Sequence, residues 1–441
     1  MEFLIERFRE NPEKTAILWQ EQEYTYGWLL ERLESAGAVL REEGIGAGAV
    51  VALRSDFNPS SIAFLIALLR NDNIIVPLSH AVKTLDEFCG IAEVEYLIDI
   101  DGDRQRCERR GAHVQHEILR ALKERHHPGL VLFSSGSTGK SKAAVHDFVP
   151  LLSKFKVRRT TLRTITFLLF DHIGGINTLF YILSNAGTVV APQERDPENI
   201  CRLIEKYQVE LLPTSPTFVN MILMSRAYEK YDLSSLKLVT YGTEAMPEQT
   251  LKRFTELFPQ IELKQTYGLS EIGIMRSRSR SSDSLWLKIG GEDYQTKIVD
   301  GVLYVKAKTA MLGYLNHPSP FDEEGWFNTQ DRVEVDGEWV KILGRETDII
   351  NVGGQKVYPA EVESVLLGID NIAEASVFGR PNPIMGYVVA ARVNLEEEEP
   401  LSALKKRIRS CCRDKLEPFK IPAHVEIASE KQVSDRFKKV R

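Results

Sequence analysis

Short apolar segments alternate with amphipathic stretches through the first half of the chain. Residues 24–44 and 218–231 carry apolar side chains at helical spacing, and residues 60–72 are typical of a buried helix. The compact apolar runs between such stretches predict strands at 49–55, 73–79, 167–170, 187–192, 209–216 and 236–242. Strands that alternate with helices indicate α/β sheets with helices packed on them.

The pattern changes after residue 284. Residues 293–307 and 332–344 alternate apolar and polar side chains and are interrupted at Asp-Gly, which predicts antiparallel hairpins and a small β-barrel-like subdomain. Beyond these hairpins, helices at 360–368 and 401–416 and strands at 374–380, 387–395 and 423–429 indicate a compact α+β unit. We therefore predict a large N-terminal domain, residues 1–344, and a small C-terminal domain, residues 345–441.

Composition excludes several classes of protein. The chain has 441 residues with a formal net charge of −6, so a general attraction to nucleic acid is not expected. It has no run of about eighteen apolar residues, so no membrane span is expected, and the acidic N-terminal segment is unlike a signal peptide. The five cysteines are scattered and form no C-x-x-C motif, so neither a disulfide framework nor a zinc site is expected. A reducing, cytoplasmic setting is therefore expected. The basic run at 154–163 is interpreted as a solvated surface.

The segment "LVLFSSGSTGKSKAAVHD", residues 130–147, has the chemistry of a phosphate loop. The loop of P-loop nucleotidases requires glycine at position 134, where this chain has Ser134, so a P-loop kinase is a weak alternative. Hydroxyls, glycine-freed backbone N–H groups and lysines can still surround a polyphosphate. The candidate residues are Ser134, Ser135, Gly136, Ser137, Thr138, Gly139, Lys140 and Lys142.

Further motifs occur in a fixed order along nearly the whole chain. They are "FDHIGG" (170–175), "YGTEAMP" (241–247), "QTYGLSE" (265–271), "WFNTQD" (326–331), "GRETDIINVGGQKVYPAEVE" (344–363) and "FKKVR" (437–441). With "SSGSTGKSK" (134–142), this series resembles the adenylate-forming superfamily: acyl-CoA synthetases, aryl-acid ligases and nonribosomal-peptide adenylation domains. The resemblance implies an enzyme that uses ATP and Mg²⁺ to convert a carboxylic acid to its acyl adenylate and pyrophosphate.

The resemblance also implies roles for residues at the nucleotide. The 134–142 loop would hold the β- and γ-phosphates, Ser270 would reach a phosphate, and Glu271 would bind magnesium. Asp331 would accept both ribose hydroxyls, with Arg345 near the ribose and α-phosphate. Gly242, Thr243, Glu244, Tyr267 and Gly268 would surround the adenine, with Tyr267 stacked on it.

The carboxylic acid would lie near His172, which the resemblance implies flanks the reacting carboxylate. Amino-acid-activating domains place an Asp after the aromatic residue of this motif, to hold the α-ammonium, and here Ile173 follows His172. An aryl or fatty acid is therefore expected, although the register Phe170-Asp171 keeps an amino-acid substrate open. The candidate acid-binding residues are His172, Ile173, Gly174, Tyr241, Met246 and Gly268, with Phe218, Met221 and Ile272 as further pocket candidates.

The second half-reaction would pass the acyl group to the thiol of CoA or of a carrier-protein phosphopantetheine. In the resembled family the C-terminal domain is mobile and rotates between the two steps, and Thr347-Asp348 lies at the hinge position. Lys438 would be the adenylation lysine, with Lys439 as the second choice.

Several motifs depart from the family pattern. Gln330 replaces a glycine, Ala143-Ala144 follows the loop lysines, and the final lysine lacks its preceding Thr-Gly. A catalytically degenerate, nucleotide-binding homologue is the alternative that these departures leave open.

Overall fold

The N-terminal domain contains two seven-stranded sheets. The computed structural model describes every residue except 103, 136–140, 429–438, 440 and 441. The first sheet has the order β13 (Glu262–Gln265), β12 (Leu238–Tyr241), β11 (Leu211–Thr214), β9 (Thr164–Ile165), β10 (Val189–Val190), β1 (Thr15–Trp19) and β2 (Gln22–Thr25). The second has the order β20 (Gly313–Tyr314), β8 (Ser141–Asp147), β7 (Gly129–Ser135), β4 (Ile74–Leu78), β3 (Val50–Arg54), β5 (Tyr96–Asp101) and β6 (Arg104–Arg109).

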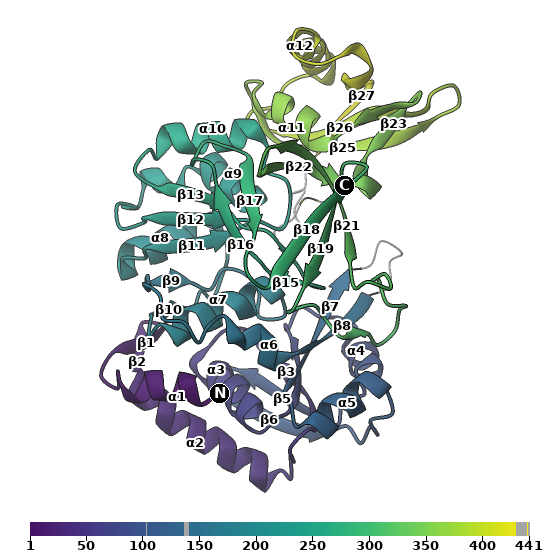
Figure 1. The fold of residues 1–441 in the computed structure, drawn as a ribbon. Coiled ribbons are helices and arrows are strands. Elements are labelled where there is room, and N and C mark those ends of the chain that lie inside the picture. The colour runs from purple at the N-terminus through teal and green to yellow at the C-terminus, as the bar shows by residue number, and fades with distance from the viewer. Residues whose placement is uncertain (103, 136–140, 429–438, 440–441) are drawn as a thin grey trace.

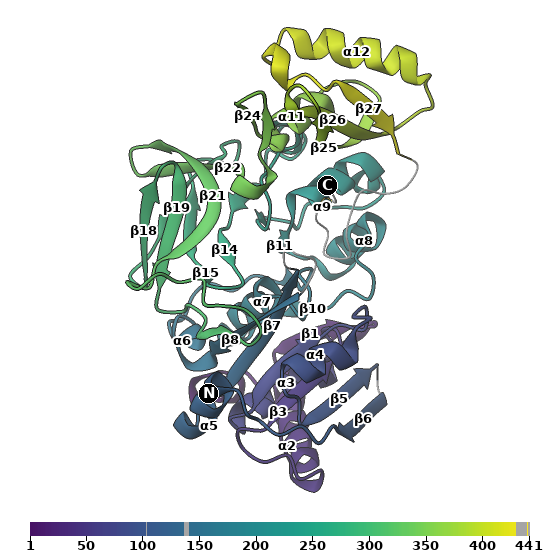
Figure 2. The same ribbon diagram turned by 90° about the vertical axis from the view of Figure 1, so that its right-hand side faces the viewer.

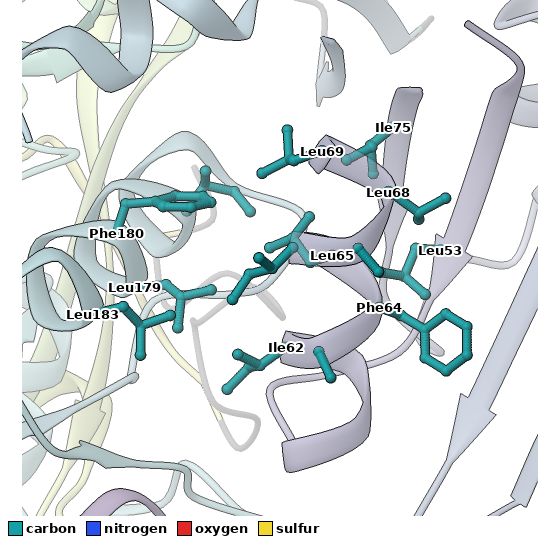
Figure 3. Packing of buried hydrophobic residues seen from close by; sticks show 14 of the residues in the cluster. Leu53, Ile62, Phe64, Leu65, Leu68, Leu69, Ile75, Leu179, Phe180 and Leu183 are labelled. Atoms are coloured by element: carbon teal, nitrogen blue, oxygen red, sulfur yellow. The ribbon is translucent and has the colours of Figure 1, made fainter. Parts of the chain in front are cut away.

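Helices α3 (Pro59–Arg70) and α7 (Ile173–Ser184) join these sheets into one core. Asn58 and Ser61 form a reciprocal capping box that begins α3, and nearly every later residue of that helix is buried. Figure 3 shows Leu65 and Leu69 of α3 facing α7, while Leu53 and Ile75 approach from the strand side. A helix buried on all sides explains the apolar run that predicted it.

Of the remaining helices, α1 (Glu2–Arg9), α2 (Tyr26–Glu42) and α6 (Phe148–Ser153) pack in the same core as α3 and α7. Helices α4 (Leu85–Ile91) and α5 (Glu117–Arg125) cover the opposite face of the second sheet, and α8 (Pro197–Tyr207), α9 (Pro216–Ser225) and α10 (Glu248–Leu257) cover that of the first (Figure 1). No helix in the described ranges is long and apolar enough to cross a membrane. All five cysteines are free thiols.

Two local predictions were wrong. Residues 167–170 are not a strand, because β9 ends at Ile165 and the chain then turns into α7. At Gly175 an added Cβ would lie 2.0 Å from the Leu169 carbonyl oxygen, so this turn is packed directly against the helix. The helix predicted at 218–231 ends at Ser225, where Arg226 adopts the left-handed conformation, and a short 3-10 turn follows (Ala227–Glu229).

A six-stranded antiparallel sheet forms the predicted β subdomain (Figure 2). Asp300 and Gly301 both have positive φ between their paired strands, as a two-residue hairpin turn requires. In the second hairpin the turn residues are Gly337 and Glu338, because Asp336 pairs with Trp339. The strand order is β16 (Arg276–Ser279), β17 (Trp286–Gly290), β22 (Trp339–Arg345), β21 (Phe327–Asp336), β19 (Val302–Ala307) and β18 (Tyr294–Val299).

The C-terminal part forms a separate five-stranded sheet above β22 in Figure 1. Its elements are β23 (Ile350–Val352), β24 (Gln355–Val357), α11 (Pro359–Leu367), β25 (Ile372–Asn382), β26 (Gly386–Leu395), α12 (Leu401–Arg413), a 3-10 turn (Pro418–Lys420) and β27 (His424–Ile427). Its core is a cluster of its own, which supports a small α+β unit. The exact boundary at 344/345 stays a prediction, since β22 ends at Arg345 and β23 begins at Ile350.

Candidate active site

A cleft of about 1400 Å³, its open mouth included, lies where the N-terminal domain meets the C-terminal domain. Six segments line it, residues 242–245, 265–269, 331, 342–345 with 347–348, 359–360 and 439. Nine of the residues predicted at the nucleotide or hinge are among them: Gly242, Thr243, Glu244, Tyr267, Gly268, Asp331, Arg345, Thr347 and Asp348.

Parallel strand pairing brings two of these segments together. β12 and β13 are neighbours in register, with Tyr241 opposite Gln265, so the residues after both strands emerge at one sheet edge. A Cβ added to Gly242 would lie 2.7 Å from Thr266 Oγ1 and 2.9 Å from the Thr266 carbonyl oxygen. Only glycine permits this approach of the two loops.

Asp331 lies at the centre of the cleft wall. Its carboxylate is almost fully buried, and its Oδ2 accepts a hydrogen bond of 2.5 Å from the Tyr267 hydroxyl. Arg345 Nε lies 3.7 Å from the other carboxylate oxygen. Burial raises the pKa of Asp331, and the Tyr267 hydrogen bond and the Arg345 charge oppose that rise. The stacking of Tyr267 on adenine stays a prediction, and its hydrogen bond to Asp331 is a contact that the sequence did not predict.

Glu244 connects the adenine-side turn to the last residues of the chain. Its Oε1 accepts a 2.9 Å hydrogen bond from the Thr217 backbone N–H, and its Oε2 accepts one of 3.3 Å from the Lys439 backbone N–H. The Lys439 ammonium lies 2.9 Å from Glu363 Oε2. Lys438, predicted as the adenylation lysine, lies outside the described residues, while the second choice, Lys439, borders the cleft.

The predicted phosphate loop joins two antiparallel strands. Ser135 at the end of β7 pairs with Ser141 at the start of β8, and Ser134 pairs with Lys142. In P-loop nucleotidases the loop leads from a strand into a helix, so the kinase alternative is wrong on topology as well as on Ser134. Residues 136–140, which include Gly136, Ser137, Thr138, Gly139 and Lys140, lie outside the described ranges.

Lys142 and Glu271 converge on Tyr314, which sequence reasoning missed. The Tyr314 hydroxyl donates a 2.7 Å hydrogen bond to Glu271 Oε1, and Lys142 Nζ lies 5.6 Å from the centre of the Tyr314 ring. Strand pairing explains the arrangement, because β20 carries Tyr314 and pairs with β8, which carries Lys142. A lone tyrosine 43 residues after Glu271 gave no signal in the sequence.

The surroundings of Glu271 suit a magnesium ion. In the described part of the chain no group of three or more His, Cys, Asp or Glu side chains could hold a metal. Mg²⁺ commonly uses one or two protein carboxylates and completes its shell with water and substrate phosphates. Ser270 precedes Glu271, and its carbonyl oxygen lies 2.6 Å from Nε2 of the buried His146. That contact fixes the backbone just before the candidate metal ligand.

Most of the residues predicted at the carboxylic acid do not line the cleft. His172 caps α7, with Nδ1 accepting a 3.2 Å hydrogen bond from the Gly174 backbone N–H, and Ile173 is buried in the helix. Tyr241 and Met246 pack in the same core cluster as Phe218, so they do not line the cleft. Their role in acid binding stays a prediction, and Gly268 is the one of the six that borders the cleft.

Asp171, which the amino-acid register would use, is buried, and its Oδ1 has no hydrogen-bond partner in the described structure. This observation does not distinguish an aryl from a fatty acid. It leaves open the register in which Asp171 follows Phe170 and binds the ammonium group of an amino acid.

The cleft thus brings together the predicted nucleotide segments around Gly242, Tyr267 and Asp331, while Lys142 and Glu271 meet at Tyr314. The AMP-binding enzyme family matches residues 4–315, and the AMP-binding enzyme C-terminal domain matches residues 361–438. The chain therefore belongs to the AMP-binding enzyme family, and the resemblance predicted from the motifs is confirmed.

Curated relatives with this sequence pattern are CoA ligases. The chain is 26% identical to the indoleacetate–CoA ligase of Aromatoleum aromaticum over 95% of its own length and 92% of that protein. It is 28% identical to a 3-[(3aS,4S,7aS)-7a-methyl-1,5-dioxo-octahydro-1H-inden-4-yl]propanoyl:CoA ligase of Rhodococcus jostii over 67% of this chain, a region that spans 60% of that relative.

Solved structures share the fold over almost the entire chain. The anthranilate CoA ligase AuaEII in complex with anthranoyl-AMP is similar with a TM-score of 0.84 at 20% identity, over 99% of this chain and 95% of that one. The o-succinylbenzoate CoA synthetase of Bacillus subtilis, in complex with its acyl-adenylate intermediate, gives 0.78 at 20% identity, over 99% and 96%. The predicted architecture of a large N-terminal and a small C-terminal domain is thereby confirmed.

Proposed function

We propose that the protein is an ATP- and Mg²⁺-dependent acid–thiol ligase that forms an acyl adenylate and then a thioester. The observation that carries this proposal is the cleft in which Gly242–Glu244, Tyr267, Asp331 and Arg345 converge. The reaction couples a carboxylate to the α-phosphorus of ATP with release of pyrophosphate. Both partners are anions, so catalysis requires positioning and positive charge more than covalent chemistry.

Each group of cleft residues has a different role in this proposal. Asp331 offers buried carboxylate oxygens to the ribose hydroxyls, and Arg345 next to it adds the positive charge that the α-phosphate needs. The turn at Gly242–Glu244 borders the adenine. The β7–β8 hairpin residues and Lys142 hold the outer phosphates, and Glu271 binds the magnesium that accompanies them. Magnesium, when bound, supplies further charge neutralisation at the phosphates.

Lys438 remains the lysine that bridges the acid and the α-phosphate. Lys439 is a poorer candidate, because its ammonium is already paired with the buried carboxylate of Glu363. We infer a structural role for Lys439 in holding the chain end against the cleft. Thr347 and Asp348 border the cleft at the junction of the two domains, which supports their assignment to the hinge.

CoA is the acceptor that the relatives favour, since those matched here are CoA ligases. A carrier-protein pantetheine presents the same thiol and stays the alternative. The same relatives act on aryl and acyl acids, which supports an aryl or fatty acid as the substrate class. The expected cytoplasmic setting remains a prediction.

The amino-acid-activating alternative is favoured by one observation, the buried Asp171 Oδ1 without a partner. An α-ammonium would satisfy this oxygen. Replacement of Asp171 by Asn distinguishes the two: exchange with an amino acid would be lost, whereas exchange with an aryl or fatty acid would continue.

ATP–pyrophosphate exchange tests the proposed function. We expect exchange with members of a panel of benzoic, cinnamic, fatty and amino acids, and none with Lys438→Ala. Lys439→Ala is the matched control and should retain exchange. If no acid promotes exchange, the chain is a degenerate nucleotide-binding homologue and the proposal is overturned.

A further inference from the structure

A second cavity, of about 900 Å³ with its open mouth included, lies beside the cleft. Helix α7 contributes Asn177 and Tyr181 to it, and the segment after α6 contributes Lys154 and Arg159. Its remaining wall comes mainly from Ile274 of β15 (Gly273–Ile274), which pairs with β14 (Gly268–Leu269), and from Met275 and Arg276. None of the residues predicted at the acid lines this cavity, although His172–Gly174 begin the helix that does.

The cavity and the cleft share a wall. Thr266 borders both of them. Gly268, on the cleft side, pairs with Ile274, on the cavity side, and the Met275 backbone N–H donates a 3.0 Å hydrogen bond to the Tyr267 carbonyl oxygen. A Cβ on Gly268 would lie 2.5 Å from Ile274 Cδ1, so the Ile274 side chain packs directly against the Gly268 backbone in this wall. A substrate that extends from the cleft past Thr266 would enter this cavity.

Three cations and no acidic side chain line the cavity. Lys154 Nζ donates a 2.9 Å hydrogen bond to the Ile274 carbonyl oxygen, and its pKa is lowered to about 8 by burial and by the nearby charges of Arg159 and Arg276. Among the described residues, neither arginine has a carboxylate within ion-pairing distance. The adjacent Arg158, which does not line the cavity, is paired with Glu10 at 2.6 Å.

Arg159 and Arg276 are exposed, and the basic run is largely the predicted solvated surface, with Lys154 as its partly buried residue. Lys154 is largely covered, and the three cations repel one another without an internal counter-ion. An anion bound in the cavity would lower the electrostatic energy of these three positive charges. The same excess of positive charge disfavours a ligand that carries an ammonium group.

We propose that this cavity binds the distal acid group of a dicarboxylic substrate, whose other carboxylate is adenylated in the cleft. The inference rests on the proposed function and narrows its substrate class to aryl or aliphatic acids with a second anionic group. Arg159 and Arg276, at the mouth of the cavity, determine specificity by pairing with that group. The apolar side chains of Phe155 and Met275 contact the carbon skeleton between the two acids.

Matched pairs of acids test this inference in ATP–pyrophosphate exchange. Octanoate is compared with octanedioate, and 4-phenylbutanoate with 4-(2-carboxyphenyl)butanoate. We expect kcat/KM to be at least about tenfold higher for a diacid than for its monoacid, which corresponds to roughly 1.4 kcal/mol. In the double variant Arg159→Gln/Arg276→Gln this preference should disappear through loss of the diacid activity, with the monoacid activity changed less than about twofold.

Two controls separate the possible explanations. Arg158→Gln removes an arginine next to the cavity and should leave the preference unchanged, whereas Arg276→Lys keeps the charge and should retain part of it. CoA is absent from the exchange assay, so its phosphates cannot produce the effect. If the double variant instead raises the KM for CoA and leaves all acids unaffected, the cavity binds the acceptor and the inference is overturned.

The remaining outcomes are also decisive. Equal use of monoacids and diacids by the unsubstituted protein overturns the inference while the proposed function stands. Failure of every acid to promote exchange overturns the proposed function, and the inference with it.

Discussion

The Tyr267 hydroxyl donates a 2.5 Å hydrogen bond to Asp331 Oδ2 across 64 residues of sequence. This bond joins the turn after β13 to strand β21, and therefore joins the α/β sheet to the antiparallel subdomain in the wall of the cleft. The other carboxylate oxygen of Asp331, Oδ1, faces Arg345, whose Nε lies 3.7 Å away. If Asp331 binds the ribose as proposed, nucleotide binding and the contact between these two units depend on the same carboxylate.

Tyr267→Phe should weaken nucleotide binding and reduce stability together. The substitution leaves a buried carboxylate oxygen without its donor, which costs about 1–3 kcal/mol. We expect a lower midpoint of urea unfolding and a raised KM for ATP in pyrophosphate exchange. Tyr304→Phe, on β19 of the antiparallel subdomain and outside the cleft, is the control. An unchanged KM for ATP in the Tyr267 variant would contradict the role of this bond.

Asp331→Asn should change the pH dependence of stability. Burial raises the pKa of Asp331 in the folded protein, so the folded state holds this proton more tightly than the unfolded state. The carboxyl therefore contributes stability below its unfolded pKa of about 3.9, and that contribution is lost as the pH rises through the folded pKa.

The asparagine variant lacks this loss, so its stability relative to the unsubstituted protein should increase as the pH is raised from about 4 toward neutrality. Urea unfolding at a series of pH values measures the difference. Nucleotide binding should be lost at every pH. A stability difference that does not vary with pH would show that Asp331 does not titrate in this range.

Gly242→Ala should abolish most activity through a steric clash. The added methyl group would approach both the hydroxyl and the carbonyl oxygen of Thr266, and the carbonyl cannot rotate away. We expect exchange to fall by at least about tenfold because a small displacement at an active site removes correct positioning. Gly46→Ala, where no atom lies within 4 Å of the added Cβ, is the matched control.

Glu271→Gln should raise the magnesium concentration required for exchange, since an amide oxygen is a weaker ligand than a carboxylate. Tyr314→Phe should have a smaller effect, because it removes only the hydrogen bond that orients Glu271. A magnesium titration of exchange activity ranks the two variants. Equal magnesium dependence in the Gln variant and the unsubstituted protein would remove Glu271 from the metal site.

Lys439→Met should weaken the contact between Lys439 and Glu363 while the rate of ATP–pyrophosphate exchange changes little. It leaves the buried Glu363 carboxylate with one partner fewer, although Glu363 still accepts a 3.0 Å hydrogen bond from the Val377 backbone N–H. We expect faster proteolysis of the chain end at unchanged exchange, in contrast to Lys438→Ala. Loss of exchange in the Lys439 variant alone would reverse the two assignments.

The sequence by itself determined the types of element and the family. Apolar periodicity predicted most helices and strands because burial leaves a local signature at each position. Ordered motifs predicted the nucleotide-binding and hinge segments, and nine of their residues line one cleft. The failures at 167–170 and at Arg226 arose where the backbone, rather than the side-chain pattern, decided the local geometry.

Only the tertiary structure decided which residues meet. The Tyr314–Glu271 and Tyr267–Asp331 contacts join segments 43 and 64 residues apart, and no local pattern records such pairs. The cation cavity arises in the same way, since Lys154 and Arg159 come near Arg276 only because the segment after α6 packs against β15, where Lys154 bonds to the Ile274 carbonyl oxygen. Electrostatic energy depends on distances in space, and sequence spacing does not give those distances.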